Sequence, residues 1–551
     1  WNLVMHPFDN MRAYVLTEES THWRTEDRGE SWKSFSTDVG PDTRMESPLS
    51  FHAGDKDKIL MNGLDCMIGI FCEPTSVYTA DVFKSDAKAL RDGTSGCQWA
   101  KGTELFAERH KDLDDNRILC VIPGQYVAGN KGNKLAISDD FFESEFEPSL
   151  EADRTVSGVA KLAAVKGYIL AASIAEGTDE MALYVTSDAR NWHRAVFPHD
   201  QKFVEEAYTI LESTNYSIQI DVMTTRPSNP MGVLLSSNSN GTYFTRNVEH
   251  TNRNARGNVD FEKVAGIQGS ILSNVVDNWE EVEKSPREEK KVKSQISFDD
   301  GRTWQALKAG DDDLHIHSVT DASNSGRVFS SLAPGLMMAV GNTGKYLKPY
   351  MDGDTYVSDD AGVTWKKALD GPHKYEFGDS GSILLAMADK ETNELKYSLN
   401  HGKEWKTVEI EEKVAPYILT TTLDSTSPKF LLVATAKPKD KEKYYIMSID
   451  FDDMDKRQCK DDDLEKWYAR VDSKGEPTCI MGHKQFFMRR KADADCFVKA
   501  KFEDPTPQFQ KCDCTIEDYE CDFNFVRSAD RKECELKGPL VVPEGECKKP
   551  E

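Results

Sequence analysis

The chain has 551 residues and carries 94 Asp and Glu against 69 Lys and Arg, a formal net charge of −25. This acidic excess argues against a nucleic-acid partner and against binding to anionic membrane surfaces. No apolar run is long enough to cross a bilayer, and the chain opens on Trp1 without a signal peptide. We therefore expect a mature or cut fragment, attached to a membrane only through an anchor outside this sequence.

A repeated eight-residue pattern decides the expected fold. It places a hydroxyl residue, an acid, a glycine, a hydroxyl residue and a tryptophan at fixed spacing, and it reads TEDRGESW at 25–32, SFDDGRTW at 297–304 and SDDAGVTW at 358–365. Such an acid accepts hydrogen bonds from backbone N–H groups of a tight hairpin turn, and the glycine supplies a positive φ. We interpret Asp27, Asp299 and Asp360 as structural turn residues, because this role explains them better than catalysis does.

Weaker copies of the pattern fill the intervals, and each copy, full or weak, is called a repeat mark. Their acid positions are Asp81, Asp140, Asp188, Ser239, Asn400 and Asp450. The spacing from one mark to the next, 40 to 61 residues, is typical of a four-stranded propeller blade. The residues alone predict an all-β propeller of nine or ten blades over residues 1–450.

Other segments follow from composition. Short apolar runs such as 168–173 and 429–436 are expected to be buried strands between polar turns. Residues 84–93 are expected to form one short surface helix. The charged stretch 280–294 is expected to be a solvated hairpin loop or insert.

The cysteines indicate a second module. Eight of the twelve crowd into the last part of the chain, and the full set is Cys66, Cys72, Cys97, Cys120, Cys459, Cys479, Cys496, Cys512, Cys514, Cys521, Cys534 and Cys547. Even, local crowding favours disulfides in an oxidising compartment. Zinc is the rival, but the C-D-C at 512–514 is too tight for a zinc knuckle and His483 is the only histidine nearby. We expect a small disulfide-rich module over 451–551, of one or two subdomains, with no metal and no cofactor.

Two sequons agree with a secretory route. Asn215 and Asn240 each begin an N-x-S/T triplet and are the expected glycosylation sites. Two such triplets in a chain of this length are close to chance.

Several longer segments resemble the sortilin family. They are HIHSVT at 315–320, the stretches 332–365 and 375–387, and the cysteine-rich stretches 449–470, 479–497 and 512–523. The likeness covers essentially the whole chain and is greatest to the fungal vacuolar sorting receptors, which carry two such domains in tandem. It implies a ten-bladed β-propeller, built on these Asp-box repeats, followed by a cysteine-rich module.

The resemblance also implies a function. The chain would be one luminal domain of a single-pass receptor that carries soluble hydrolase precursors, carboxypeptidase Y among them, from the late Golgi to the endosome or vacuole. Its partners would be peptide or propeptide segments of those hydrolases, beside a tandem second domain of the same receptor, and it would not be an enzyme. The module has eight cysteines where the family is known for ten, and 535–546 is short; both departures suggest a diverged ligand choice or the less active copy of a tandem pair.

A ligand residue can be nominated by the same likeness. In the family, a tunnel-wall arginine binds a peptide carboxylate, and Arg246 is the candidate here because Thr242, Phe244 and Arg246 share one face of an expected strand. The competing interpretation is an ordinary surface arginine. Release at lower pH would need titrating groups, and the 12 histidines are the natural candidates.

Two other functions compete. A glycoside hydrolase is one, because acid-box propellers occur in sialidases and a catalytic carboxylate pair could lie among 94 acids. A structural adhesion ectodomain is the other. The cysteine-rich module favours the receptor.

Overall fold

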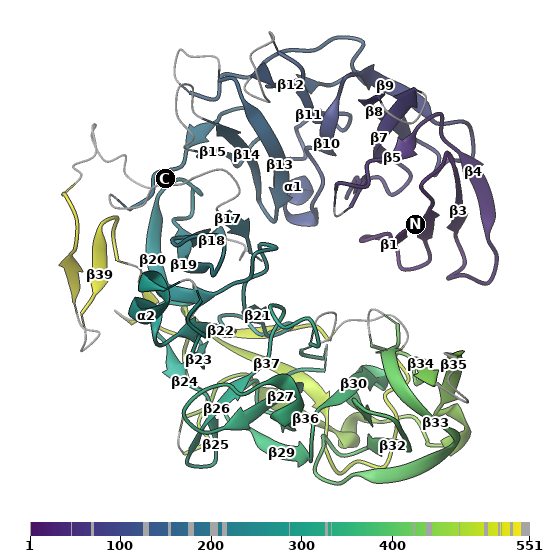
Figure 1. Cartoon of the computed structure of the whole chain (residues 1–551), viewed down its shortest axis with the longest axis vertical. Helices are drawn as coiled ribbons and strands as arrows, with labels where there is room; N and C mark the ends of the chain where they lie inside the picture. The colour runs from purple at the N-terminus through teal and green to yellow at the C-terminus, as the bar shows by residue number, and fades with distance from the viewer. Residues whose placement is uncertain are drawn as a thin grey trace. The chain divides into compact units, whose positions relative to one another are not determined.

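The computed structural model describes most of the chain in two compact units. The residues described are 2–45, 47–67, 71–124, 132–151, 156–174, 181–198, 208–211, 217–285, 287–324, 329–331, 333–422, 425–436, 443–472, 474–500, 505–515, 518–519, 521–528 and 533–540. Unit 1 comprises 1–220, 235–245 and 536–551, and unit 2 comprises 221–234 and 246–535. Figure 1 shows both units as sheets of short strands with few helices.

Unit 1 is built from antiparallel sheets whose strands follow one another in sequence. Its elements are β1 (Asn2–Met5), β2 (Ala13–Leu16), β3 (Thr21–Thr25), β4 (Lys33–Ser36), β5 (Gly40–Pro41), β6 (Leu49–Phe51), β7 (Ile59–Met67), β8 (Phe71–Thr79), β9 (Lys88–Asp92), β10 (Ser95–Trp99), α1 (Glu104–Arg109), β11 (Ile118–Ile122), β12 (Lys134–Ser138), β13 (Val159–Val165), β14 (Tyr168–Ile174), β15 (Met181–Thr186), β16 (His193–Arg194) and β17 (Tyr208–Ile210). The sheets β1-β2-β3-β4 and β13-β14-β15-β16 are four-stranded meanders.

The chain passes between the units within three strands. These are β18 (Gln219–Met223), β19 (Met231–Ser237) and β20 (Phe244–Asn252). All seven residues of β19 are buried, as expected for an apolar run in the middle of a sheet.

Unit 2 continues the same construction and adds the cysteine-rich segment. Its elements are β21 (Phe261–Lys263), β22 (Ile271–Val276), α2 (Trp279–Lys284), β23 (Val292–Ser297), β24 (Gln305–Ala306), β25 (Lys308–Ala309), β26 (Asp312–Ile316), β27 (Met337–Thr343), η2 (Tyr350–Asp352), β28 (Asp354–Ser358), β29 (Lys366–Leu369), β30 (His373–Gly378), η3 (Asp379–Gly381), β31 (Ile383–Ala388), β32 (Thr392–Ser398), β33 (Lys406–Thr420), β34 (Lys429–Ala436), β35 (Lys443–Asp450), η5 (Asp452–Met454), η6 (Asp461–Asp463), β36 (Leu464–Tyr468), β37 (His483–Arg490), β38 (Gln508–Lys511) and β39 (Phe525–Arg527), followed by β40 (Cys534–Leu536).

Four-stranded antiparallel meanders are the blades of propeller folds, so the predicted all-β, propeller-type fold is confirmed. In β1-β2-β3-β4, for example, Leu16 pairs with Asn2, and Ala13 pairs with Thr25. The number of blades stays a prediction.

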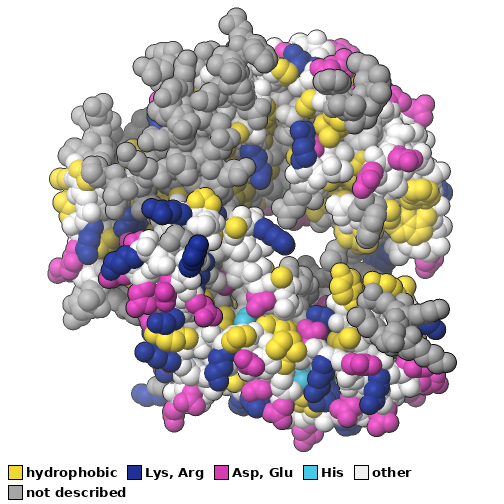
Figure 2. Space-filling view, viewed as in Figure 1, with side chains coloured by type: hydrophobic (Ala, Val, Ile, Leu, Met, Phe, Trp, Pro, Cys, Tyr) yellow, Lys and Arg dark blue, Asp and Glu magenta, His cyan; other side chains and the backbone are white. Residues whose placement is uncertain are grey.

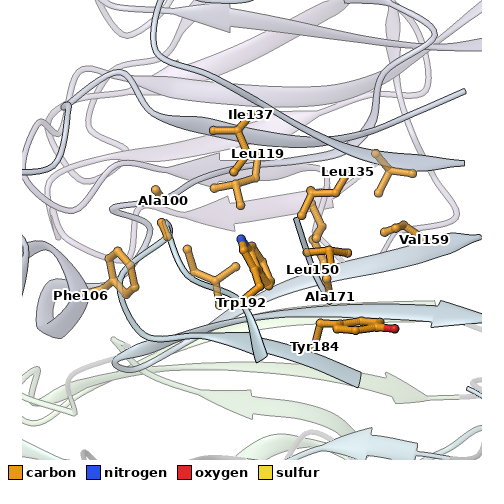
Figure 3. Packing of buried hydrophobic residues seen from close by; sticks show 14 of the residues in the cluster. Ala100, Phe106, Leu119, Leu135, Ile137, Leu150, Val159, Ala171, Tyr184 and Trp192 are labelled. Atoms are coloured by element: carbon orange, nitrogen blue, oxygen red, sulfur yellow. The ribbon is translucent and has the colours of Figure 1, made fainter. Parts of the chain in front are cut away.

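Apolar side chains from neighbouring sheets fill the space between them. Figure 3 shows one such cluster in unit 1, where Trp192 packs among Leu119, Leu135, Leu150 and Ala171. Trp192 is 6% exposed. It is the tryptophan of a repeat mark, as is the buried Trp365, whereas Trp32 of another mark is 41% exposed.

Two local expectations were wrong or incomplete. Residues 84–93 form no helix, because Lys88–Asp92 pairs with β8 as strand β9 and buries Leu90. The charged stretch 280–294 holds the short helix α2, which buries Val282, and the start of strand β23. In both segments tertiary pairing or packing outweighs the polar composition.

Candidate functional site

The repeat marks form one recurrent turn. Asp299 accepts hydrogen bonds at Oδ1 from Ser297 Oγ and from the Thr303 backbone N–H, both at 2.8 Å, and at Oδ2 from Thr303 Oγ1 at 2.6 Å. Ser297 Oγ in turn accepts the Gly301 N–H at 2.8 Å. The mark thus joins the last two strands, β23 and β24, of its sheet.

The other two full marks repeat this geometry. Asp360 accepts from Ser358 Oγ at 2.8 Å and from the Thr364 N–H at 2.9 Å. Asp27 accepts from Thr25 Oγ1 at 2.7 Å and from the Ser31 N–H at 2.9 Å. These hydrogen bonds, with Ser31 first among them, lower the pKa of Asp27 to about 2. Their carboxylates are engaged in turns, which supports the structural interpretation of all three acids.

Each full turn has two adjacent residues with positive φ. At Asp300 and Gly301 the angles are 58° and 88°, and at Arg28 and Gly29 they are 62° and 88°. The weaker copies at 79–85 and 138–144 keep this conformation without glycine, since Phe83 and Phe142 also have positive φ. The hydrogen bonds of the acid therefore impose the turn even where the residue is unfavourable for it.

Two weak marks were assigned incorrectly. The acceptor in the turn at 237–244 is Asn238, whose Oδ1 accepts the Thr242 N–H at 2.9 Å, and Ser239 does not take the acid position. Asp450 ends strand β35, where its carboxylate pairs with Lys429 and accepts the Asp452 N–H, so no repeat turn forms there.

The nominated ligand residue lies in strand β20. The Arg246 side chain is 24% exposed, and its Nη1 donates to Glu249 Oε1 at 2.6 Å. Phe244, on the same expected face, is fully buried. Arg246 is therefore a partly accessible guanidinium with Glu249 among its partners, and its role in ligand binding stays a proposal.

Of the two sequon residues, Asn240 lies on the described surface. Asn240 is exposed in the turn before β20, where an enzyme could reach its side chain. Asn215 lies outside the described residues.

A buried polar cluster in unit 2 was not anticipated. Its centre is an ion pair between Arg253 Nη1 and Asp221 Oδ1 at 2.7 Å, with side chains 2% and 0% exposed. Thr251 Oγ1 also donates to Asp221. A Cβ at Gly232 would lie 2.2 Å from Asp221 Oδ1, so only glycine leaves room for the carboxylate.

Lys290 and Asp260 extend the cluster. The Lys290 amine donates to the carbonyls of Pro230 at 2.7 Å and Arg253 at 2.8 Å. Asp260 accepts from the amides of Asn252 at 2.8 Å and Asn274 at 3.0 Å. Lys290 and Asp260 thus each have more than one hydrogen-bond partner, as buried polar groups require.

The HIHSVT segment is fixed by the same cluster. The Thr320 N–H donates to Asp260 at 2.9 Å, and Ser318 Oγ donates to Glu262 Oε1 at 2.5 Å. His315 Nδ1 accepts the Ser294 N–H at 3.1 Å. The segment that carries the family likeness is thus held by buried hydrogen bonds.

Three groups of this cluster have pKa values shifted toward neutrality. Burial raises the pKa of Asp221 to about 6 despite Arg253, raises that of Glu262 to about 7, and lowers that of Lys290 to about 8. Burial also lowers the pKa of His315, in the segment beside them.

The histidines are mostly core residues. Burial lowers the pKa of His22, His52 and His373 to about 4 and that of His401 to about 3. Their neutral forms are the ones that the folded chain prefers.

Ten cysteines form five disulfides. The pairs are Cys66–Cys72, Cys97–Cys120, Cys459–Cys496, Cys479–Cys512 and Cys521–Cys534. Among the described residues Cys514 forms no disulfide, and its thiol is free and exposed. Cys547 lies outside the described residues.

Strand β37 fastens the cysteine-rich segment to three successive sheets. Gln485 donates to the Gly266 carbonyl at 2.8 Å, Arg489 to the Asp359 carbonyl at 2.7 Å, and Arg490 to the Leu399 carbonyl at 2.9 Å. Asp359 and Leu399 lie in or next to repeat turns. The turns therefore provide the backbone acceptors on which the segment docks.

The visible surface carries mixed charge. Figure 2 shows acidic and basic side chains interspersed over the face in view. No helix among the described residues has the length and apolar character needed to span a membrane. Nor do those residues include a group of three or more His, Cys, Asp or Glu placed to hold a metal ion.

The repeat turns and the docked cysteine-rich segment match a known family. A family profile described as "Sortilin, neurotensin receptor 3" matches residues 1–419, and its C-terminal counterpart matches 421–551. The chain belongs to the sortilin family.

Relatives in this family are named "Vacuolar protein sorting/targeting protein 10". Those of Pyricularia oryzae and Chaetomium globosum are 55% and 54% identical to this chain, and that of Paracoccidioides lutzii is 54% identical. Each match covers 100% of this chain and 37% of the relative. This chain thus spans well under half the length of these sortilin-family relatives.

Proposed function

We propose that the chain is the luminal, cargo-binding part of a transmembrane sorting receptor. The observation that carries the proposal is the match of the entire chain to sortilin-family proteins named for vacuolar protein sorting and targeting. Its cargo would be soluble hydrolase precursors, of which carboxypeptidase Y is an example. The chain would bind their peptide or propeptide segments in the late Golgi and release them in the endosome.

The same proposal covers the organisation of the chain. Residues 1–450 would form a ten-bladed propeller, and 451–551 would form the cysteine-rich module. The docking of β37 on successive sheets supports a module that acts as one body with the propeller part of unit 2. A membrane anchor and a tandem second domain would lie in the rest of the receptor.

The glycoside hydrolase alternative is not favoured. A general acid needs a raised pKa and access to substrate, whereas hydrogen bonds within the turn lower the pKa of Asp27 to about 2. Asp221, whose pKa is raised, is fully buried against Arg253. Neither of these two acids therefore combines a raised pKa with access to a substrate.

The experiment is a binding assay with immobilised chain and propeptides of vacuolar hydrolases at pH 7 and pH 5, run beside a screen of glycosidase substrates. The proposal expects propeptide capture at pH 7, weaker capture at pH 5, and no glycoside turnover. Turnover of a glycoside without capture of any propeptide would overturn it.

A further inference from the structure

Four strands from four different sheets of unit 1 contribute to the walls of one pocket. They are β1, β6, β10 and β13, and each pairs with a single neighbouring strand among the described residues. The pocket has a volume of about 430 Å³, which lies within the usual range of about 300–1,000 Å³ for small-molecule sites. It therefore has room for one ligand of that size.

Most of the described residues that line this pocket are apolar. Leu49, Phe51 and Leu162 are 6%, 7% and 9% exposed, so the packed interior holds them in place. Met5, which is 37% exposed, and Met45 add flexible thioether side chains. Methionine adapts to irregular apolar shapes, so these walls suit the body of an apolar ligand.

Side-chain hydrogen bonds fix strand β10 at the pocket. Asn62 Oδ1 accepts the Cys97 N–H at 2.7 Å, and its Nδ2 donates to the Cys97 carbonyl at 3.1 Å. The Trp99 N–H donates to Ser50 Oγ at 3.3 Å. These contacts join β10 to β7 and β6, and they hold this wall in place without a ligand.

A β-bulge in β10 precedes Gln98. Ser95 pairs with Val121 and Gln98 with Leu119, so three steps along β10 match two along β11. Gly96, within the bulge, has a φ of 56°, which glycine adopts without strain. Bulges re-aim side chains and are common beside functional sites. Here the residue that ends the bulge, Gln98, belongs to the lining of the pocket.

The amide of Gln98 has an unpaired polar atom. Its Nε2 is buried and has no hydrogen-bond partner among the described residues. A buried amide nitrogen without a partner is costly, and the torsion that orients a terminal amide is soft. A rotation of this group would bring one of its two polar atoms to a ligand. A neutral amide matches either atom, because it offers both an N–H and a carbonyl.

We propose that this pocket binds a small uncharged molecule in which an amide joins two apolar groups. The amide would hydrogen-bond to Gln98, and the apolar groups would contact Leu49, Phe51 and Leu162. The described lining does not include Arg246. The site is therefore additional to the one proposed for cargo.

Calorimetric titration of the 551-residue chain at pH 7 tests the proposal. The probes are N-benzylhexanamide and N-benzylhexylamine, which has the same length but a charged amine and no carbonyl. We expect the amide to bind roughly tenfold more tightly, because the amine would bury a charge and lose the hydrogen bond to Gln98. Binding of the amide should also have a negative heat-capacity change, the mark of buried apolar surface. Equal binding of the two probes, tighter binding of the amine, or no binding of either would overturn the proposal.

Two variants locate the site. Gln98→Leu removes the amide at nearly constant volume and should weaken binding of N-benzylhexanamide about fivefold. Ala164→Phe, at a half-buried position in the lining, fills the pocket and should weaken binding about tenfold or more. Ala160→Phe is the matched control, because Ala160 is exposed on the same strand and lies outside the described lining.

Circular dichroism melting shows whether each variant folds. Gln98→Leu provides the test if Ala164→Phe does not fold. Unchanged affinity in a folded Gln98→Leu, or the same loss in Ala160→Phe, would overturn the assignment.

A peptide probe distinguishes a small molecule from a polypeptide segment. A tripeptide of alanine, leucine and alanine, blocked at both ends, also places amides between apolar groups. Weaker binding of this peptide than of N-benzylhexanamide supports a small-molecule site, and tighter binding would overturn that class of ligand. The test uses no cargo protein, so its failure would leave the proposed sorting function untouched.

Discussion

Arg253 and Asp221 form an ion pair of 2.7 Å in which neither side chain is more than 2% exposed. Removing Asp221 would take away the carboxylate that is bonded to the buried Arg253 guanidinium. Such truncations cost about 3–5 kcal/mol, whereas a buried pair as a whole contributes much less to the free energy of unfolding. The pair therefore holds β18 beside the end of β20. Its net contribution to the free energy of unfolding is small.

Asp221→Asn tests this dependence. The substitution keeps the shape of the side chain and removes the negative charge that pairs with Arg253. We expect the free energy of unfolding of unit 2 at pH 8 to fall by about 3 kcal/mol, measured by urea denaturation. Lys308→Ala, which breaks an exposed pair with Asp313, is the matched control and should leave the transition where it is. An unchanged transition in Asp221→Asn would contradict the assigned role.

The acids of the repeat turns act as hydrogen-bond acceptors, so their charge should matter less to stability than that of Asp221. Asn400 already replaces the acid in one turn and accepts the Glu404 N–H at 2.9 Å. Asp299→Asn should therefore be tolerated, whereas Asp299→Ala leaves the N–H of Thr303 unsatisfied and should destabilise by about 1–2 kcal/mol. Thermal melting of the two variants checks this. Equal loss in both would mean that the charge, and not the acceptor, matters.

The repeat turns could be predicted from the sequence because their interactions are local. Asp299, Gly301 and Trp304 interact within eight residues, so a local pattern was enough to predict the turn and, from the spacing, the sheets. The local pattern gave the wrong acceptor at 237–244. Asn238, one residue before the expected Ser239, accepts the hydrogen bond of the turn. Local chemistry identifies a turn, but the hydrogen-bond register within it depends on the flanking strands.

The buried cluster could not be predicted for the opposite reason. Asp221, Arg253 and Lys290 are separated by tens of residues, and each occupies an ordinary polar position in the sequence. Only the pairing of strands brings them together and buries them. The helix prediction for residues 84–93 was wrong for the same reason. Their composition suits a helix, but pairing with β8 makes Lys88–Asp92 a strand.

The contribution of Glu376 to stability should change with pH in the opposite direction to that of the buried histidines. Its side chain is 4% exposed, and burial raises its pKa to about 7. A folded-state pKa above the unfolded value means that the stabilising contribution is complete below about pH 4.5 and is lost as pH rises through 7. Histidines with depressed pKa values instead lose stability as pH falls below about 6.5.

Glu376→Gln isolates this contribution. The glutamine keeps an acceptor for the Phe377 N–H, which lies 2.9 Å from Oε1, and cannot ionise. We expect the variant to be more stable than the parent by about 1–3 kcal/mol at pH 8, with a difference that disappears near pH 4.5. Urea denaturation at four pH values checks this. A constant difference at every pH would show that ionisation is not the cause.

Strand β37 docks the cysteine-rich segment on the sheets. Weakening these contacts should therefore release that segment while the sheets before it stay folded. Arg489 donates to Pro334 at 3.0 Å, pairs with Glu465 at 2.9 Å, and lies 4.5 Å from the centroid of the Trp467 ring. Arg489→Ala removes these contacts together with the hydrogen bond to Asp359, and should expose the segment after 451 to protease several-fold faster, while the sheets before it resist. Lys484→Ala on the same strand is the control. Uniform acceleration throughout unit 2 would instead indicate global unfolding.

The last prediction concerns Arg246 and its neighbour Glu249. If Arg246 receives a ligand carboxylate, Glu249 competes for the same guanidinium, since Nη1 lies 2.6 Å from Oε1. Arg246→Ala should weaken propeptide binding at pH 7 about tenfold, and Glu249→Gln should strengthen it by a smaller factor. Because the pair is partly exposed, neither change should lower the melting temperature measurably. Surface plasmon resonance with an immobilised propeptide measures both affinities. Affinities that fall in both variants would mean that the pair acts as a structural unit, and unchanged affinities would remove Arg246 from the site.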